Sequence, residues 1–134
     1  MPAFNSGLHI LINQKLFVPT LSPHVNYSTV NYVDSKQKTT LVKLIENNYD
    51  YEFITCILKH LTNNNLNRKD ADNKTALDYC FEKTKTMNEE TLKVKGYDQL
   101  QLYLIGKNVN MNTKTFVDYM DTTNTELLLK SFAA

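Results

Sequence analysis

The chain has 134 residues, and its 15 Lys and Arg residues nearly balance its 14 Asp and Glu residues, for a formal net charge of +1. This length allows one domain with a hydrophobic core, and the charge balance argues against a dedicated binder of nucleic acid or of anionic membranes. The 3 glycines nearly exclude a glycine-rich phosphate loop, and the 2 cysteines are too few for a disulfide framework. No apolar stretch approaches the roughly 20 residues that span a bilayer. We therefore expect a single domain over residues 1–134, located in the cytoplasm with reduced thiols.

The first half of the chain predicts two pairs of helices. An apolar stretch at residues 8–12 begins the first pair, but its second member would run through Pro19 and Pro23, which forbid a regular helix. A short or irregular helix is expected there. Leu41, Leu44 and Ile45 then form an apolar face with helical spacing, and a longer face follows at residues 53–61.

The second half predicts a third pair and a fourth. Leu77, Cys80 and Phe81 begin the third pair, and the apolar residues at 100–105 complete it. The polar stretch between them, residues 83–95, is about ten residues longer than a standard repeat unit allows, so it predicts an extended loop or an extra helical turn. The fourth pair is expected at residues 116–120 and 127–129.

Related segments precede these helices at regular intervals. A hydroxyl-bearing residue stands at Ser6, Thr39, Thr75 and Thr115, with spacings of 33, 36 and 40 residues. An apolar-Asn-x-x-Asp lead-in occupies residues 30–34 and 66–70, and a shorter one begins at residue 109. A Thr hydroxyl is a good N-cap for a helix, and an Asp can accept hydrogen bonds from the amides of a turn. The chain therefore divides into units at roughly 1–29, 30–65, 66–108 and 109–134.

These segments resemble the ankyrin repeat, a unit of about 33 residues with a β-turn, two helices and a T-P-L-H-x-A signature. The signature positions are residues 6–9, 39–42, 75–78 and 115–118, without proline in any of them and with His only at His9. The Gly of the family's Asp-x-x-Gly-x-Thr turn is replaced by Gln37 and Asn73. We expect Asn there, and in the run at residues 63–65, to take over positive backbone angles from the missing glycines. The resemblance, over residues 4–132, implies an all-α fold: an ankyrin-like helical solenoid of about 3.5 units with degenerate capping ends.

Candidate chemical groups are few. His9 is expected to be a buried structural histidine, and Cys80 a core residue that fills a small apolar position. Cys56 and His60 lie four residues apart on an expected helix, but two ligands do not make a zinc site. We expect a core cysteine and a solvated histidine at the helix end, and we expect no catalytic residue, metal or cofactor. Asp78-Tyr79 and Asp118-Tyr119 repeat at one position of successive units, which favours a structural role.

The resemblance implies that the turn tips and first helices line a groove that binds a protein partner. Tyr32 and Tyr49 are the aromatic anchors expected near it. The predicted partner-binding residues are Asn13, Gln14, Tyr32, Val33, Ser35, Lys36, Lys38, Glu46, Asn47, Tyr49, Lys69, Asp72, Lys74, Glu82 and Lys83.

The function expected is a non-enzymatic protein-interaction module, with no nucleic acid or membrane as partner. The 16 Asn, 14 Lys and single Arg are typical of an AT-rich genome, which favours the hypothesis of a viral or bacterial factor that acts on a host protein in the host cytoplasm. Two functional alternatives remain open: a regulatory ankyrin segment of a larger enzyme, and a small enzyme with a cryptic Cys56–His60 site. A compact helical bundle with coincidental repeats remains open as an alternative fold. The identity of the partner and the oligomeric state do not follow from the sequence.

Overall fold

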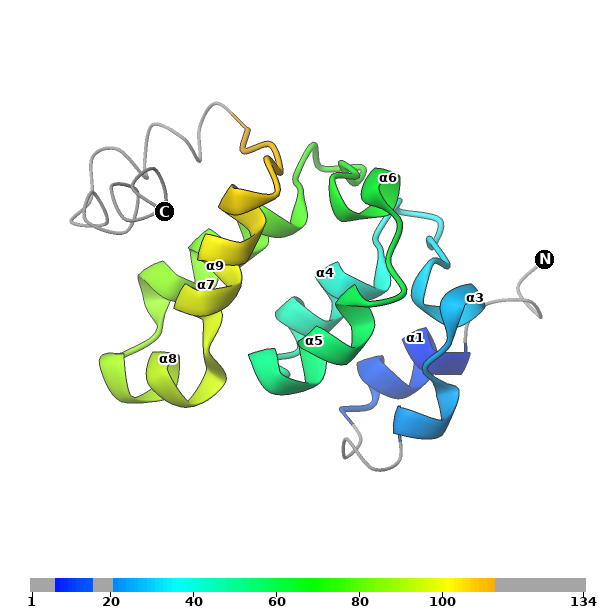
Figure 1. Ribbon diagram of the computed structural model, residues 1–134, viewed down its shortest axis with the longest axis horizontal. Helices are drawn as coiled ribbons and strands as arrows, with labels where there is room; N and C mark the ends of the chain where they lie inside the picture. The colour runs from blue at the N-terminus through cyan, green and yellow to red at the C-terminus, as the bar shows by residue number, and fades with distance from the viewer. Residues whose placement is uncertain (1–6, 16–20, 113–134) are drawn as a thin grey trace.

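The structure, a computed structural model, describes residues 7–15 and 21–112, and this part of the chain is all-α (Figure 1). The elements are α1 (Gly7–Asn13), the 3-10 helix η2 (Ser22–His24), α3 (Tyr27–Val30), α4 (Thr40–Glu46), α5 (Tyr51–Leu58), α6 (Asn63–Leu66), α7 (Ala76–Thr86), α8 (Glu89–Lys95) and α9 (Tyr97–Gly106). Within the described residues the β structure is limited to one isolated bridge between Val33 and Thr39. The expected fold class is confirmed at this level.

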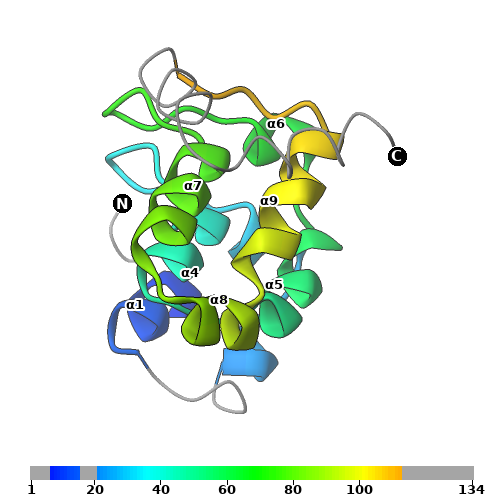
Figure 2. The same ribbon diagram turned by 90° about the vertical axis from the view of Figure 1, so that its left-hand side faces the viewer.

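The helices pack as three successive pairs. α1 packs on α3, α4 on α5, and α7 on α9, while α4 also packs on both α1 and α7. Figure 1 shows the pairs following one another along the longest axis of the molecule. Figure 2 views them end-on, with α1, α4 and α7 on one side and α5 and α9 on the other. The first helices of the pairs therefore form one row, and the second helices adjoin it.

The predicted apolar faces build the core. Leu41, Leu44 and Ile45 of α4 are fully buried, and Cys80 of α7 is fully buried at the position equivalent to Leu44. Other fully or nearly fully buried side chains come from each pair: Leu8, Ile12, Ile54, Ile57, Leu77, Phe81, Leu100 and Leu104. Burial raises the pKa of the Cys80 thiol, which is consistent with a packing role.

The turns at residues 34–38 and 70–74 repeat one geometry at an offset of 36 residues. In each turn the carboxylate of the leading Asp accepts hydrogen bonds from the amides two and four residues later, at 2.8 to 3.0 Å. Gln37 and Asn73, at the fourth position, both have φ of 63°. The predicted turn function of Asp34, Asp70 and Asn73 is thus confirmed.

Thr39 and Thr75 are the N-caps of the helices that follow, as predicted, although they use different bonds. The Thr39 hydroxyl accepts a hydrogen bond from the amide of Val42 at 3.3 Å. The amide of Thr75 donates to the buried carboxylate of Asp78 at 2.8 Å. Ser6 and Thr115 lie outside the described residues. The same holds for the predicted fourth unit beyond residue 112.

Several local predictions need correction. Residues 63–65 do not supply positive φ angles; they form α6, with Thr62 as its N-cap. Besides Gln37 and Asn73, positive angles occur at Lys15, after α1, and at Asn48 and Asn108, where the chain turns after α4 and α9. The polar stretch in the third unit contains a complete extra helix, α8. The irregular helix expected around Pro19 and Pro23 falls partly on residues 16–20, which lie outside the described residues. The described part around Pro23 contains η2 and the single-turn helix α3.

Gly96 joins α8 to α9 and cannot be replaced without strain. Its φ is +71°, and a Cβ atom there would lie 3.0 Å from the Cβ of Tyr51. We expect Gly96→Ala to lower the free energy of unfolding by about 2 kcal/mol, through left-handed backbone strain and this contact. Gly106, where an added Cβ would meet no other atom within 4 Å, is the matched control: Gly106→Ala is expected to be neutral or slightly stabilising. Urea unfolding of both variants measures the difference, and equal losses would contradict it.

Candidate functional site

The exposed edge of the molecule is built from the two turns. The amide of Ala71, in the second turn, donates to the carbonyl oxygen of Lys36, in the first, at 2.9 Å. This bond fixes the distance between the turns and leaves the side chains of Ser35, Lys36 and Asp72 exposed. We call residues 34–38, residues 69–74 and the Lys–Glu pairs described next the turn face.

Two ion pairs flank one aromatic ring on the turn face. The Nζ atoms of Lys38 and Lys74 lie 2.7 Å from the carboxylates of Glu46 and Glu82, respectively. They also lie 5.6 and 5.1 Å from the ring centroid of Tyr79, within the range of a cation–π interaction. The pairs repeat at the same offset of 36 residues as the turns. Tyr79 therefore fills the space between two equivalent positions of neighbouring units.

The second turn also binds Tyr79 through a hydrogen bond. This tyrosine is only 8% exposed, and its hydroxyl donates to Oδ2 of Asp70. Burial raises the pKa of Tyr79, and the Asp70 carboxylate raises it further. A hydrogen bond to Glu82 is the main cause that raises the pKa of Lys74. The neutral phenol and charged amine both stabilise this arrangement at neutral pH.

The first turn has a different partner at the equivalent position. Lys43 stands four residues after Thr39, as Tyr79 does after Thr75, and its Nζ lies 3.2 Å from Oδ2 of Asp34. Partial burial raises the pKa of Asp34, but the amide of Lys38 and the side chain of Lys43 outweigh it, so the net shift is downward. Both turn carboxylates are thus bound by the first turn of the following helix, once by an amine and once by a phenol.

The predicted binding residues divide by exposure. Seven are exposed: Asn13, Gln14, Ser35, Lys36, Lys69, Asp72 and Glu82. Seven are half-buried: Tyr32, Val33, Lys38, Glu46, Asn47, Lys74 and Lys83. The turn face contains eight of them, with Lys69 included, whereas Asn13 and Gln14 lie at the end of α1 and not in the turns.

The two predicted aromatic anchors do not project from the surface. Tyr49 is 9% exposed and packs against Phe53 with a centroid distance of 5.9 Å. Its carbonyl oxygen accepts a hydrogen bond from the hydroxyl of buried Tyr97 at 2.5 Å. Its assignment as a surface anchor is therefore corrected: it is a core residue, because the chain reverses after Asn48 and directs the ring inward. Tyr32 is half-buried, with its ring in a T-shaped contact with His9 at 4.9 Å.

The other residues considered for chemistry are His9, Cys56 and His60. His9 is buried, as predicted, and its Nε2 lies 2.8 Å from the hydroxyl of Thr40. The expectation of a core position for Cys56 is wrong: this cysteine is exposed, because Phe53, Ile54 and Ile57 form the buried face of α5. His60 is half-buried just after α5, and its carbonyl oxygen accepts a bond from Asn31. Across residues 7–15 and 21–112, no three His, Cys, Asp or Glu side chains gather as metal ligands would.

Sequence reasoning misses two kinds of functional candidate. Repetition alone predicts only a general structural role for Tyr79, although its position four residues after Thr75 matches that of Lys43, and this match indicates contact with the turn carboxylate. The side chains of Asn48, Thr86, Met87, Thr91 and Lys95, which line a hollow beside α8, lack any periodic signal because the insertion has no counterpart in the second unit.

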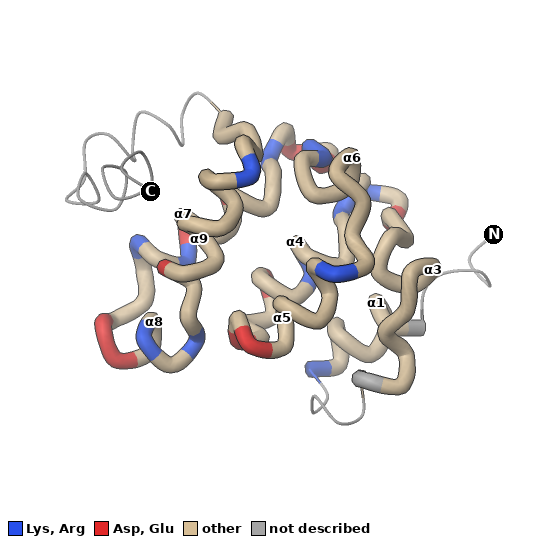
Figure 3. Tube along the Cα trace, viewed as in Figure 1, with Lys and Arg blue, Asp and Glu red and all other residues tan. Residues whose placement is uncertain are grey.

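Figure 3 shows basic and acidic positions interspersed along the trace of the turns. Comparisons with protein-family models, with curated proteins and with solved structures found no match.

None of the helices in the described ranges combines the length and the apolar character that a bilayer crossing needs.

Proposed function

We propose that this chain is a degenerate ankyrin-like repeat domain that binds a protein partner through the turn face. The observation that carries the proposal is the recurrence of one turn, one helix N-cap position and one Lys–Glu pair at an offset of 36 residues. Repeated units that contact only their neighbours create extended surfaces rather than enclosed sites. Such a surface suits another protein better than a small substrate.

The composition of the turn face supports a partner that is itself a folded or extended protein segment. Its exposed side chains carry both charges, on Lys36, Lys69 and Asp72, and they border the half-buried Lys–Glu pairs. Mixed charges of this kind contribute specificity and orientation more than bulk affinity. The pairs are already satisfied within the chain, so the exposed turn residues are the ones available to a partner.

The test is affinity capture from the cytosol of the source organism, with quantitative mass spectrometry. A triple variant with Lys36→Glu, Lys69→Glu and Asp72→Lys reverses three exposed charges on the turn face. We expect it to reduce capture of a specific partner about tenfold, since each rim charge contributes about 0.5 kcal/mol.

A matched control makes the same change in net charge elsewhere. Glu52→Lys, Lys59→Glu and Lys93→Glu alter three exposed residues on α5, just after α5, and on α8. This control is expected to retain capture, and circular dichroism should show the same helical content in both proteins. Equal capture by the two triple variants would contradict the proposal.

A further inference from the structure

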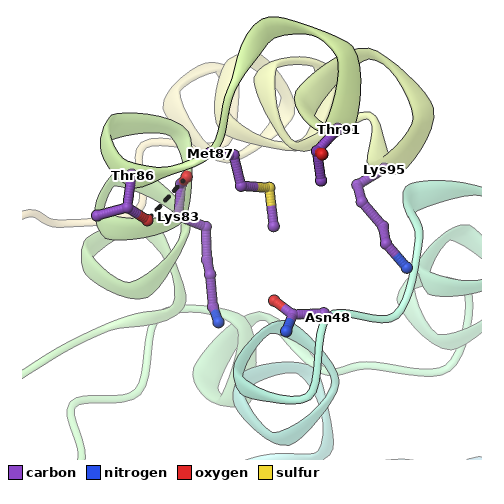
Figure 4. Close-up of a pocket in the computed structure, with 6 residues that line it drawn as sticks. All are labelled: Asn48, Lys83, Thr86, Met87, Thr91 and Lys95. Atoms are coloured by element: carbon purple, nitrogen blue, oxygen red, sulfur yellow. Dashed lines mark hydrogen bonds between the residues drawn. The ribbon is translucent and has the colours of Figure 1, made fainter.

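The insertion that interrupts the repeat creates a polar hollow. Its volume is about 530 Å³, and it is lined by Asn48, Lys83, Thr86, Met87, Thr91 and Lys95. Figure 4 shows Lys83 and Lys95 extending from opposite sides, with Met87 between them and Asn48 facing them. In the third unit, α8 lies between α7 and α9 and forms one side of the hollow. In the second unit only four residues separate α4 from α5, so no helix stands at the equivalent place.

Helix α8 contributes little to the core. None of its residues is fully buried: Leu92 is half-buried against the core, and Val94 is 76% exposed. The helix nevertheless supplies Thr91 and Lys95 to the hollow. A helix that fully buries no side chain gains little stability from packing, so its contribution to the hollow is the clearest role that the structure gives it.

The hollow carries two positive charges and no carboxylate among its lining residues. The ion pairs within the described residues use Lys38, Lys43 and Lys74, and none uses Lys83 or Lys95. The Nζ of Lys83 donates to the carbonyl oxygen of Glu46 at 3.4 Å, which uses one of the three donors of an ammonium group. Both lysines are half-buried.

The other polar groups at the hollow do not neutralise these charges. The carbonyl ends of α4 and α7 lie nearby, but a helix end carries at most about half an elementary charge. The total positive charge of the two ammonium groups is therefore larger than the partial negative charge of the two helix ends. Thr86, Thr91 and Asn48 add hydroxyl and amide groups, which can donate to an anion as well.

We infer that this hollow is a binding site for a phosphate group, either free or carried by a phosphorylated side chain. A phosphate ester has a charge of about −1.5 to −2 at pH 7 and three acceptor oxygens. Its charge therefore matches the total charge of the two lysines, which that of a monoanion such as acetate does not. The inference is independent of the proposed turn face, because the variants that alter the two surfaces share no residue.

The experiment is an NMR titration of the full chain, in which amide shifts are followed during addition of inorganic phosphate, a short phosphoserine peptide or acetate. We expect phosphate-bearing probes to shift the amides of Asn48, Thr86 and Thr91, and to bind more tightly than acetate. Lys83→Gln and Lys95→Gln should each weaken binding about fivefold. Lys93→Gln, which removes an exposed charge from the same helix without lining the hollow, should change it less than about twofold.

The outcomes separate the source of the phosphate from the existence of the site. Tighter binding of the peptide assigns a modified protein side chain, and tighter binding of inorganic phosphate assigns a small phosphate compound. Equal weakening by Lys93→Gln and Lys95→Gln would indicate diffuse attraction and overturn the inference. Shifts that are absent, or that fall outside the hollow, would overturn it too.

Discussion

Replacement of Asp70 by alanine is expected to lower the free energy of unfolding by about 3 kcal/mol. The Asp70 carboxylate is buried and accepts hydrogen bonds from the amides of Asp72 and Lys74 and from the hydroxyl of Tyr79. A buried donor that loses its acceptor costs about 1 to 3 kcal/mol. Water can bond to one of the freed amides, because the turn is exposed. The hydroxyl of Tyr79 lies against the core and would be left without an acceptor.

The repeat supplies the controls for this prediction. Asp34→Ala removes the equivalent carboxylate from a half-buried turn whose side-chain partner, Lys43, can be hydrated, so a loss of about 1.5 kcal/mol is expected. Asp70→Asn keeps an acceptor for the turn amides and should cost about 1 kcal/mol. Urea unfolding curves of the three variants give the comparison. A loss for Asp70→Ala no larger than that for Asp34→Ala would show that Tyr79 does not depend on this carboxylate.

Acidification is expected to destabilise the contact between the first two helix pairs through His9. The Thr40 hydroxyl donates to the carbonyl oxygen of Thr29 at 3.1 Å, so Nε2 of neutral His9 is the donor to Thr40. The pKa of His9 is lowered from 6.5 to about 4, mainly by burial and also by the nearby Lys43 ammonium, while Asp34 opposes both. His9 is therefore neutral in the folded protein over a range in which the unfolded chain is protonated.

The sign of the pH dependence follows from this difference. Between pH 6.5 and about 4 the unfolded state binds a proton that the folded state does not, so stability is complete above pH 6.5 and decreases as the pH falls. The full loss is about 3 kcal/mol. The lowered pKa of Asp34 acts in a separate, more acidic range, below its ordinary value of 3.8.

The measurement is the free energy of unfolding as a function of pH for the natural chain and for His9→Gln. Glutamine does not titrate and retains an N–H donor for Thr40. We expect His9→Gln to be less stable at neutral pH but nearly flat between pH 6.5 and 4. A variant that loses stability as steeply as the natural chain would assign the acid sensitivity to other groups.

The parts of the fold that are predictable from sequence are those governed by local rules. The spacing of Leu41, Leu44 and Ile45 predicts α4, and the Asp-x-x-x-x-Thr interval predicts the turns, because caps and turn carboxylates act within a few residues. The positive φ of Asn73 follows from the same rules. The interval of 36 residues then relates one turn to the next without any knowledge of long-range contacts.

The errors arise where a residue's environment depends on distant segments. Cys56 and Tyr49 both follow α4, and only the packing of α5 decides that the first is exposed and the second is buried. The positive-φ preference of Asn suggests turns at residues 63–65, but Thr62 caps this run as a helix and the side chain of Asn31 bonds to it. The hollow beside α8 joins two units, so no local pattern in either of them predicts it.

The backbone bond between Ala71 and Lys36 couples the motions of the two exposed turns. Neither turn can move away from the helices by itself without breaking this bond. A partner that displaces the first turn therefore also strains the second, together with the Asp70–Tyr79 contact beneath it. We expect displacement of either turn to be transmitted to the other through this bond, with no change in the hydrophobic core.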